Sequence, residues 1–223
     1  MEATVSKKGR GVYLYSKGEE IFNAVTHIAG GALGITVWVV LLCFAAPDPA
    51  YMAAVSAFGF GATLLYTMSA LYHFLPRGGR AKKVFRVFDH CTIFVLIAGT
   101  YTPYCVIALG GTVAGTAVLI AQWTLAAAGI TMNAIAMNNK VVKGLSMALY
   151  VVTGWMALAV IRPLAAALST ASLALLIAGG LAYTLGIFFY AFGKKVRYFH
   201  SVWHLFDVVG TALQFVSVLL TLL

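Results

Sequence analysis

The sequence has little charge of either sign, and acidic residues are especially rare. Only 9% of the 223 residues are charged, and the chain has six Asp and Glu residues but 15 Lys and Arg residues. Hydrophobic residues make up 62% of the chain. About a quarter of the residues are charged in an ordinary soluble domain, so this composition excludes that class and indicates a protein embedded in a membrane.

Cysteines and processing signals are also scarce. The three cysteines, Cys43, Cys91 and Cys105, show no C-x-x-C spacing. We interpret them as free, buried side chains, although a bridge between Cys43 and Cys105 is conceivable because both lie toward the same ends of their predicted spans. The first twenty residues are polar and basic, and no small-residue cleavage site closes a short apolar core. We therefore expect no cleavable signal peptide.

Seven apolar runs are long enough to cross a bilayer, for which about 20 residues suffice. They are Ile21–Phe44, Tyr51–Leu75, Phe88–Leu109, Gly111–Ile135, Gly144–Ile161, Ala171–Phe192 and Tyr198–Leu223. The third and fourth runs together have about twice the length of one span, so we interpret the glycines between them as a tight turn. The sequence predicts an all-α bundle of seven transmembrane helices in residues 21–223, after a basic cytoplasmic tail in residues 1–20.

Basic residues set the orientation of this bundle. With seven spans, every Lys and Arg except Arg162 lies in the N-terminal tail or in a loop on the same side of the membrane. The positive-inside rule then places the N-terminus in the cytoplasm and the C-terminus outside. We interpret the net charge of +9 as a rim that faces anionic membrane lipids, in a multi-pass protein of the plasma (inner) membrane, and we expect no nucleic-acid partner.

The histidines gather at one depth of the predicted bundle. All five lie within about 12 Å of the cytoplasmic ends of their spans, at a rise of about 1.5 Å per residue. Four acidic residues share this layer, whereas the outer two-thirds of the bundle is almost free of ionisable groups. The members of the layer are His27, His73, His90, His200, His204, Glu19, Glu20, Asp89 and Asp207. Ionisable residues inside spans are costly, so the clustering predicts a buried functional site that faces the cytosol.

A zinc site is the chemistry that this layer predicts. His200 and His204 are four residues apart and lie on one face of a helix, where they offer two metal ligands. Three imidazoles with an open fourth position are typical of catalytic zinc, and we predict His73 as the third ligand. Asp89 is the predicted catalytic carboxylate. Ser69, one turn before His73, is the predicted hydrogen-bonding residue that supports the site.

Each predicted ligand also has a simpler interpretation. Taken singly, His73 is interpreted as an interfacial histidine that bonds to a backbone carbonyl. The pair His200 and His204 is interpreted as two polar residues that hydrogen-bond to a neighbouring helix. Iron, cobalt and nickel accept similar imidazole sites. We interpret five further polar residues in or near this layer as structural. They are Glu19, Asn23 and His27 as a polar face or helix start, His90 beside Asp89, and Asp207 as a residue that orients a ligand or bonds across helices.

Three segments resemble the bacterial hemolysin III family, which belongs with the progestin and adiponectin receptors and more distantly with alkaline ceramidases. They are Asp89–Pro103 with its DHCTIF and LIAGTYTP motifs, Gly179–Gly186 (GGLAYTLG) and His200–Phe206 (HSVWHLF). The resemblance extends from Glu19 into the seventh span. The chain departs from the family pattern at Gln214, where many members carry a histidine, and its N-terminal tail is shorter than that of the receptors.

The resemblance implies a zinc ion held near the cytoplasmic side by His73, His200 and His204, with Asp89 near its water. It also implies one functional hypothesis, a zinc-dependent hydrolase of membrane lipids that cleaves amide bonds such as those of ceramides. The alternative is a non-enzymatic regulator of membrane homeostasis or a pore-forming cytolysin in which zinc is structural. The apolar outer part of the bundle argues against a wide permanent pore, because a channel lining carries polar groups along its length.

Overall fold

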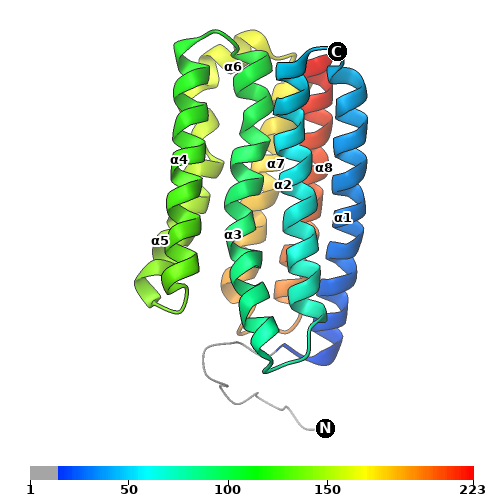
Figure 1. Cartoon of the computed structure of the whole chain (residues 1–223), viewed down its shortest axis with the longest axis vertical. Coiled ribbons are helices and arrows are strands. Elements are labelled where there is room, and N and C mark those ends of the chain that lie inside the picture. Colours follow the sequence, from blue (N-terminus) through cyan, green and yellow to red (C-terminus); the bar gives the residue numbers. More distant parts are fainter. Residues whose placement is uncertain (1–14) are drawn as a thin grey trace.

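The structure is a computed structural model that describes residues 15–223. It is a bundle of helices that run nearly parallel to one long axis (Figure 1). The helices are α1 (Lys17–Ala45), α2 (Pro49–Phe74), α3 (Arg80–Pro103), α4 (Val113–Ala136), α5 (Lys140–Gly154), α6 (Ile161–Ala167), α7 (Thr170–Phe192) and α8 (Phe199–Leu222). A π-helical turn, Tyr104–Ala108, extends α3, and a 3-10 turn, Met156–Val160, joins α5 to α6.

The predicted all-α membrane fold is confirmed. Within residues 15–223, seven helical stretches are long and apolar enough to cross a membrane, and no strand is present. Five of them are the single helices α1, α2, α4, α7 and α8. The other two are composite, because α3 continues through the π-turn to Ala108 and α5 continues through the 3-10 turn and α6 to Ala167.

Several helices begin earlier than hydropathy predicts. The third spanning helix begins at Arg80 instead of Phe88, and the fifth begins at Lys140 instead of Gly144. Both extensions carry basic residues, so a hydropathy pattern excludes them although the backbone is helical. The extension of α3 matters most, because it brings Lys82 into a buried position.

The first helix also begins inside the predicted tail. The Ser16 hydroxyl accepts a hydrogen bond from the Glu19 backbone N–H at 3.3 Å, and the Ser16 backbone N–H donates to the Glu19 carboxylate at 2.8 Å. This reciprocal pair is a capping box, which satisfies two backbone donors at the helix start. As a result α1 begins at Lys17, and both Glu19 and Glu20 belong to the bundle.

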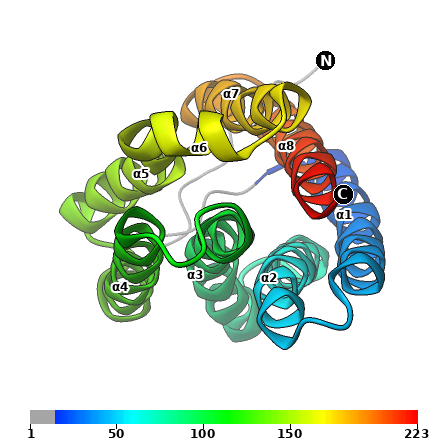
Figure 2. The same cartoon turned by 90° about the horizontal axis from the view of Figure 1, so that it is seen from above.

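The helices form a closed ring when viewed along the bundle axis (Figure 2). Helices α1 to α4 pack successively in chain order, and α8 closes the ring by packing against both α7 and α1. At one end of the bundle α1, α3 and α8 begin and α2 ends (Figure 1). This end, which the positive-inside rule assigns to the cytosol, also holds the start of α5 and the ends of α4 and α7.

Backbones approach closely where the first three helices meet. A Cβ atom built on Gly34 of α1 would lie 2.8 Å from the backbone nitrogen of Thr63 in α2. A Cβ atom on Gly99 of α3 would collide with the backbone carbonyl of Ala57 in α2. Small residues at such crossings allow tight packing of membrane helices, which here fixes α1 and α3 against α2.

Two positions away from the predicted site differ from expectation. Cys43 is exposed rather than buried, whereas Cys91 and Cys105 are buried, and all three are free. Gln214 has a structural polar role: its side-chain oxygen accepts a hydrogen bond from the Tyr104 hydroxyl at 3.0 Å, and its side-chain nitrogen donates to the Leu176 carbonyl at 3.0 Å. These bonds tie α8 to the π-turn and to α7.

Candidate metal centre

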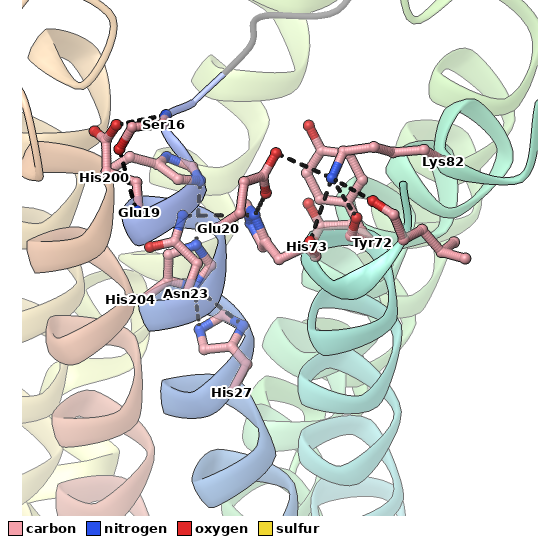
Figure 3. Close-up of polar contacts among 12 residues, drawn as sticks. Ser16, Glu19, Glu20, Asn23, His27, Tyr72, His73, Lys82, His200 and His204 are labelled. Carbon is pink, nitrogen blue, oxygen red and sulfur yellow. Dashed lines mark hydrogen bonds and ion pairs between the residues drawn. The ribbon is translucent and has the colours of Figure 1, made fainter. Parts of the chain in front are cut away.

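The structure brings the three predicted zinc ligands together. His73 lies in the last turn of α2, and His200 and His204 lie in the first two turns of α8. Their side chains offer nitrogen atoms that all lie within 4.8 Å of one another. The three residues are 2%, 5% and 0% exposed, respectively. Figure 3 shows them facing one another beside the first turns of α1.

The geometry and chemistry of this group fit a divalent metal ion. The Nε2 atoms of His200 and His204 are 3.1 Å apart. An ion with tetrahedral bonds of 2.0–2.1 Å holds its ligand nitrogens about 3.3 Å apart. The Nε2 of His73 is buried and has no hydrogen-bond partner among residues 15–223. Buried polar atoms are normally hydrogen-bonded, so this nitrogen is available to bind an ion.

The second ring nitrogens of two ligands are held by α1. The Nδ1 of His73 lies 2.7 Å from a carboxylate oxygen of Glu20, and the Nδ1 of His204 contacts the ring of His27. Metal-binding histidines usually bond through their other nitrogen to a carboxylate or a similar group, which fixes the ring orientation. Glu20 thus leaves the Nε2 of His73 facing the other two imidazoles.

Glu20 belongs to the polar layer of the sequence, where no role was predicted for it. The assumed face was Glu19, Asn23 and His27, at four-residue spacing. In the structure the Glu19 carboxylate instead accepts hydrogen bonds from the backbone N–H groups of Ser16 and Tyr198, at 2.8 and 2.9 Å. Glu20, Asn23 and His27 are spaced by three and then four residues, so they also share one face of a helix. This spacing is the sequence signal that could have placed Glu20 in the site.

A buried lysine supports Glu20. The Lys82 ammonium is 3.0 Å from the second carboxylate oxygen of Glu20, and the residue is 1% exposed. It also donates hydrogen bonds to the backbone carbonyls of Tyr72 and Leu75 at 2.9 and 3.1 Å. These carbonyls belong to the C-terminal turn of α2, where no further helical N–H is available to them. Lys82 therefore links the start of α3, the end of α2 and the carboxylate that orients His73 (Figure 3).

The predicted catalytic carboxylate lies beside the histidines. Asp89 of α3 is 4% exposed and lies close enough for its charge to act on His73 and His200, but its carboxylate is outside both sets of potential ligand atoms that lie within 4.8 Å of one another. One of its oxygens is 3.4 Å from the Nδ1 of His90. Ser69 is completely buried next to Asp89, but its hydroxyl makes no well-formed hydrogen bond within residues 15–223. Ser69 is therefore a neighbour of the acid rather than a partner of a predicted ligand.

His27 joins the imidazole cluster, although its sequence position suggested a structural role. It is 1% exposed, and its ring centroid is 3.8 Å from that of His204. His27, His204 and Asp207 form a second set whose potential ligand atoms all lie within 4.8 Å of one another. Because both sets share His204, they describe neighbouring positions in one centre. His90 stays outside both sets, with its Nδ1 3.0 Å from the Arg86 carbonyl.

An aromatic ring packs against the candidate metal centre just before α1. Tyr15 is 6% exposed, and its ring is stacked on His200 with 4.4 Å between centroids. It also lies 6.0 Å from the ring of His73. The stacking covers His200 and restricts access of water to this ligand. Tyr15 was not among the predicted site residues, because it lies outside every apolar run of the sequence.

Fold and site together define a multi-pass, seven-helix membrane protein with a buried histidine cluster at one end of the bundle. The family of haemolysin-III related proteins matches residues 15–215, and the chain belongs to this family. It is 39% identical to the hemolysin-3 homolog of Bacillus subtilis (strain 168), over 90% of this chain and 93% of that protein. It is 36% identical to hemolysin-3 of Bacillus cereus, over 90% of each chain. The resemblance noted in the sequence is confirmed.

Proposed function

We propose that this protein is a zinc-binding hydrolase of membrane lipids, with its site at the cytosolic face of the plasma membrane. The observation that carries the proposal is the convergence of His73, His200 and His204 near the buried carboxylate of Asp89, with the Nε2 of His73 buried and unpartnered within residues 15–223. Three neutral imidazoles leave a fourth coordination position for water or substrate, as in catalytic zinc sites. The substrate bond is an amide or ester of a fatty acid, consistent with the family resemblance.

Each residue of the centre has a defined task in this proposal. Zinc, when bound, polarises the acyl carbonyl and lowers the pKa of water to about 7. Asp89 accepts a proton from the attacking water at a carboxylate oxygen and returns it to the leaving group. Glu20 keeps the His73 ring in the orientation that leaves Nε2 free, and His27 does the same for His204.

A structural role of zinc is the second candidate function. It is favoured by the way in which the histidine cluster and its partners connect α1, α2 and α8 at one end of the bundle. A metal ion at this junction would fasten the helices of a non-enzymatic membrane regulator. Both functions use the same ligands, so they differ in what Asp89 does.

The Asp89→Asn variant separates the two functions. The purified protein, reconstituted with zinc into lipid vesicles that contain ceramide or phospholipid, is assayed for released fatty acid. Hydrolysis by the wild type and its loss in Asp89→Asn, at unchanged zinc content, would support the hydrolase. Asp48→Asn is the matched control, because Asp48 caps α2 at the opposite end of the bundle. Absence of fatty-acid release by zinc-loaded wild type would contradict the hydrolase and leave the structural role.

A further inference from the structure

A groove lies between the start of α1 and the end of α2. Its volume is about 400 Å³. The buried side chains of His73 and Glu20 form part of its wall, so the groove borders the candidate metal centre at one predicted ligand and at the carboxylate that orients it. A second cavity of about 120 Å³ lies among α3, α5, α7 and α8, but its lining includes none of the three predicted zinc ligands. That cavity borders the centre at Asp207, whereas the groove is the one of the two that is lined by a predicted zinc ligand, His73.

The outer wall of the groove is apolar and faces the bilayer. Val25 and Ile28 of α1 are each 59% exposed, and Phe74 of α2 is 78% exposed. All three lie in helices that are long and apolar enough to span the membrane. Exposed apolar side chains at this depth contact acyl chains, so the groove is open to a lipid from the side.

The rim of the groove is positively charged. Lys17 of α1 and Arg77, just after α2, both line it. Neither residue takes part in any of the ion pairs within residues 15–223. Two cations without an ion-pair partner in this part of the chain, at the predicted cytosolic interface, complement a phosphate group, since basic residues at this surface attract anionic lipids.

The order of these features along the groove matches that of an anionic phospholipid. Lys17 precedes Glu20 by three residues of α1, about 4.5 Å along the helix axis, and Arg77 lies in the loop that follows His73 and the end of α2. In a glycerophospholipid, the acyl ester carbonyls lie between the phosphate and the acyl chains. A phosphate at the rim with chains along the apolar wall thus directs an ester carbonyl toward His73.

We propose that the groove between α1 and α2 binds an anionic glycerophospholipid of the cytosolic leaflet as the substrate. This inference rests on the proposed hydrolase function and names its substrate class. Water adds to the acyl carbon, the bond from that carbon to the glycerol oxygen breaks, and the glycerol oxygen takes up a proton. The products are a fatty acid and a lysophospholipid, without any change of oxidation state.

Lipid binding tests the groove separately from hydrolysis. Protein in nanodiscs of phosphatidylcholine with a minor fraction of phosphatidylglycerol is analysed by native mass spectrometry for retained phosphatidylglycerol. Replacing both rim cations, by Lys17→Gln and Arg77→Gln, should weaken its retention about thirtyfold. The control replaces two cations elsewhere on the same face, by Lys140→Gln and Lys195→Gln, and should keep retention near the wild-type level. Val25→Trp, which fills the groove from its exposed wall, should also displace the lipid.

The outcomes distinguish a failure of the proposed lipid binding in the groove from a failure of the proposed hydrolase activity. Equal retention of phosphatidylglycerol and phosphatidylcholine by the wild type would overturn the proposal that the groove binds an anionic lipid. So would a loss of phosphatidylglycerol in the control variant equal to that in the rim variant. If the zinc-loaded wild type retains phosphatidylglycerol but releases fatty acid only from other lipids, the substrate assignment fails while the hydrolase stands. If it releases fatty acid from no lipid, the hydrolase itself fails. Release from phosphatidylglycerol that falls in the rim variant, at unchanged zinc content, supports both.

Discussion

Glu20 should control how tightly the centre binds zinc. Its carboxylate lies 2.7 Å from the Nδ1 of His73 and 3.0 Å from the Lys82 ammonium. Loss of a group that orients a metal ligand typically weakens metal binding 10–100-fold, which corresponds to about 1.4–2.7 kcal/mol. In Glu20→Gln the amide oxygen still accepts a hydrogen bond from His73, so we expect about tenfold weaker binding. Glu20→Ala removes the acceptor, and we expect a loss near a hundredfold.

A competition titration measures this difference. Wild type and variants in detergent micelles are titrated with zinc against a chromophoric chelator, at one pH and one salt concentration. Glu19→Gln is the matched control, because the Glu19 carboxylate bonds to the backbone N–H groups of Ser16 and Tyr198 and to none of the three ligand rings. Its zinc affinity should equal that of the wild type. Equal affinities of wild type and Glu20→Ala, or the same loss in Glu19→Gln, would refute the role of Glu20.

Three further predictions concern stability, measured as apparent melting in detergent. Lys82→Met leaves the Glu20 carboxylate buried without its cation and should cost about 3–5 kcal/mol, whereas an unchanged melting temperature would show that the ion pair is not needed. Gly99→Ala should cost about 1–3 kcal/mol because its methyl group meets the backbone of α2, and Gly144→Ala, with open space around it, should cost nothing. Equal melting of these two variants would argue against the close crossing. Tyr66→Phe removes a buried hydroxyl that donates to a carbonyl of α8 at 2.8 Å and should cost about 1–3 kcal/mol, so wild-type melting would contradict this contact.

The number of spans follows from the sequence because the bilayer imposes it. A helix in lipid needs about 20 apolar residues, and the charges that separate such runs remain visible in the sequence. The helix ends are set by other forces. Ser16 and Glu19 start α1 through a capping box, and the basic turn that begins at Arg80 is helical although it is polar. Hydropathy alone detects neither feature.

The candidate site was only partly predictable for a related reason. Spacing within one helix and depth within the membrane suffice to group His200 and His204 with His73. They do not tell which face of α1 meets α2, so Glu20 received no role until the packing of the helices was known. The role of Lys82 was unpredictable for the same reason. The sequence does not distinguish a lysine in an exposed loop from a lysine that is buried in an ion pair.

Metal content tests the central claim most directly. The protein is purified without chelators, and zinc per chain is determined by inductively coupled plasma mass spectrometry for the wild type and three histidine variants. We predict about one zinc per chain in the wild type, because zinc is the metal that commonly occupies a three-histidine site with an open fourth position. We predict the same value in His90→Ala, because the His90 ring lies outside the cluster. We predict none in His73→Ala or His204→Ala. A metal-free wild type, or full zinc in His204→Ala, would contradict the three-histidine centre.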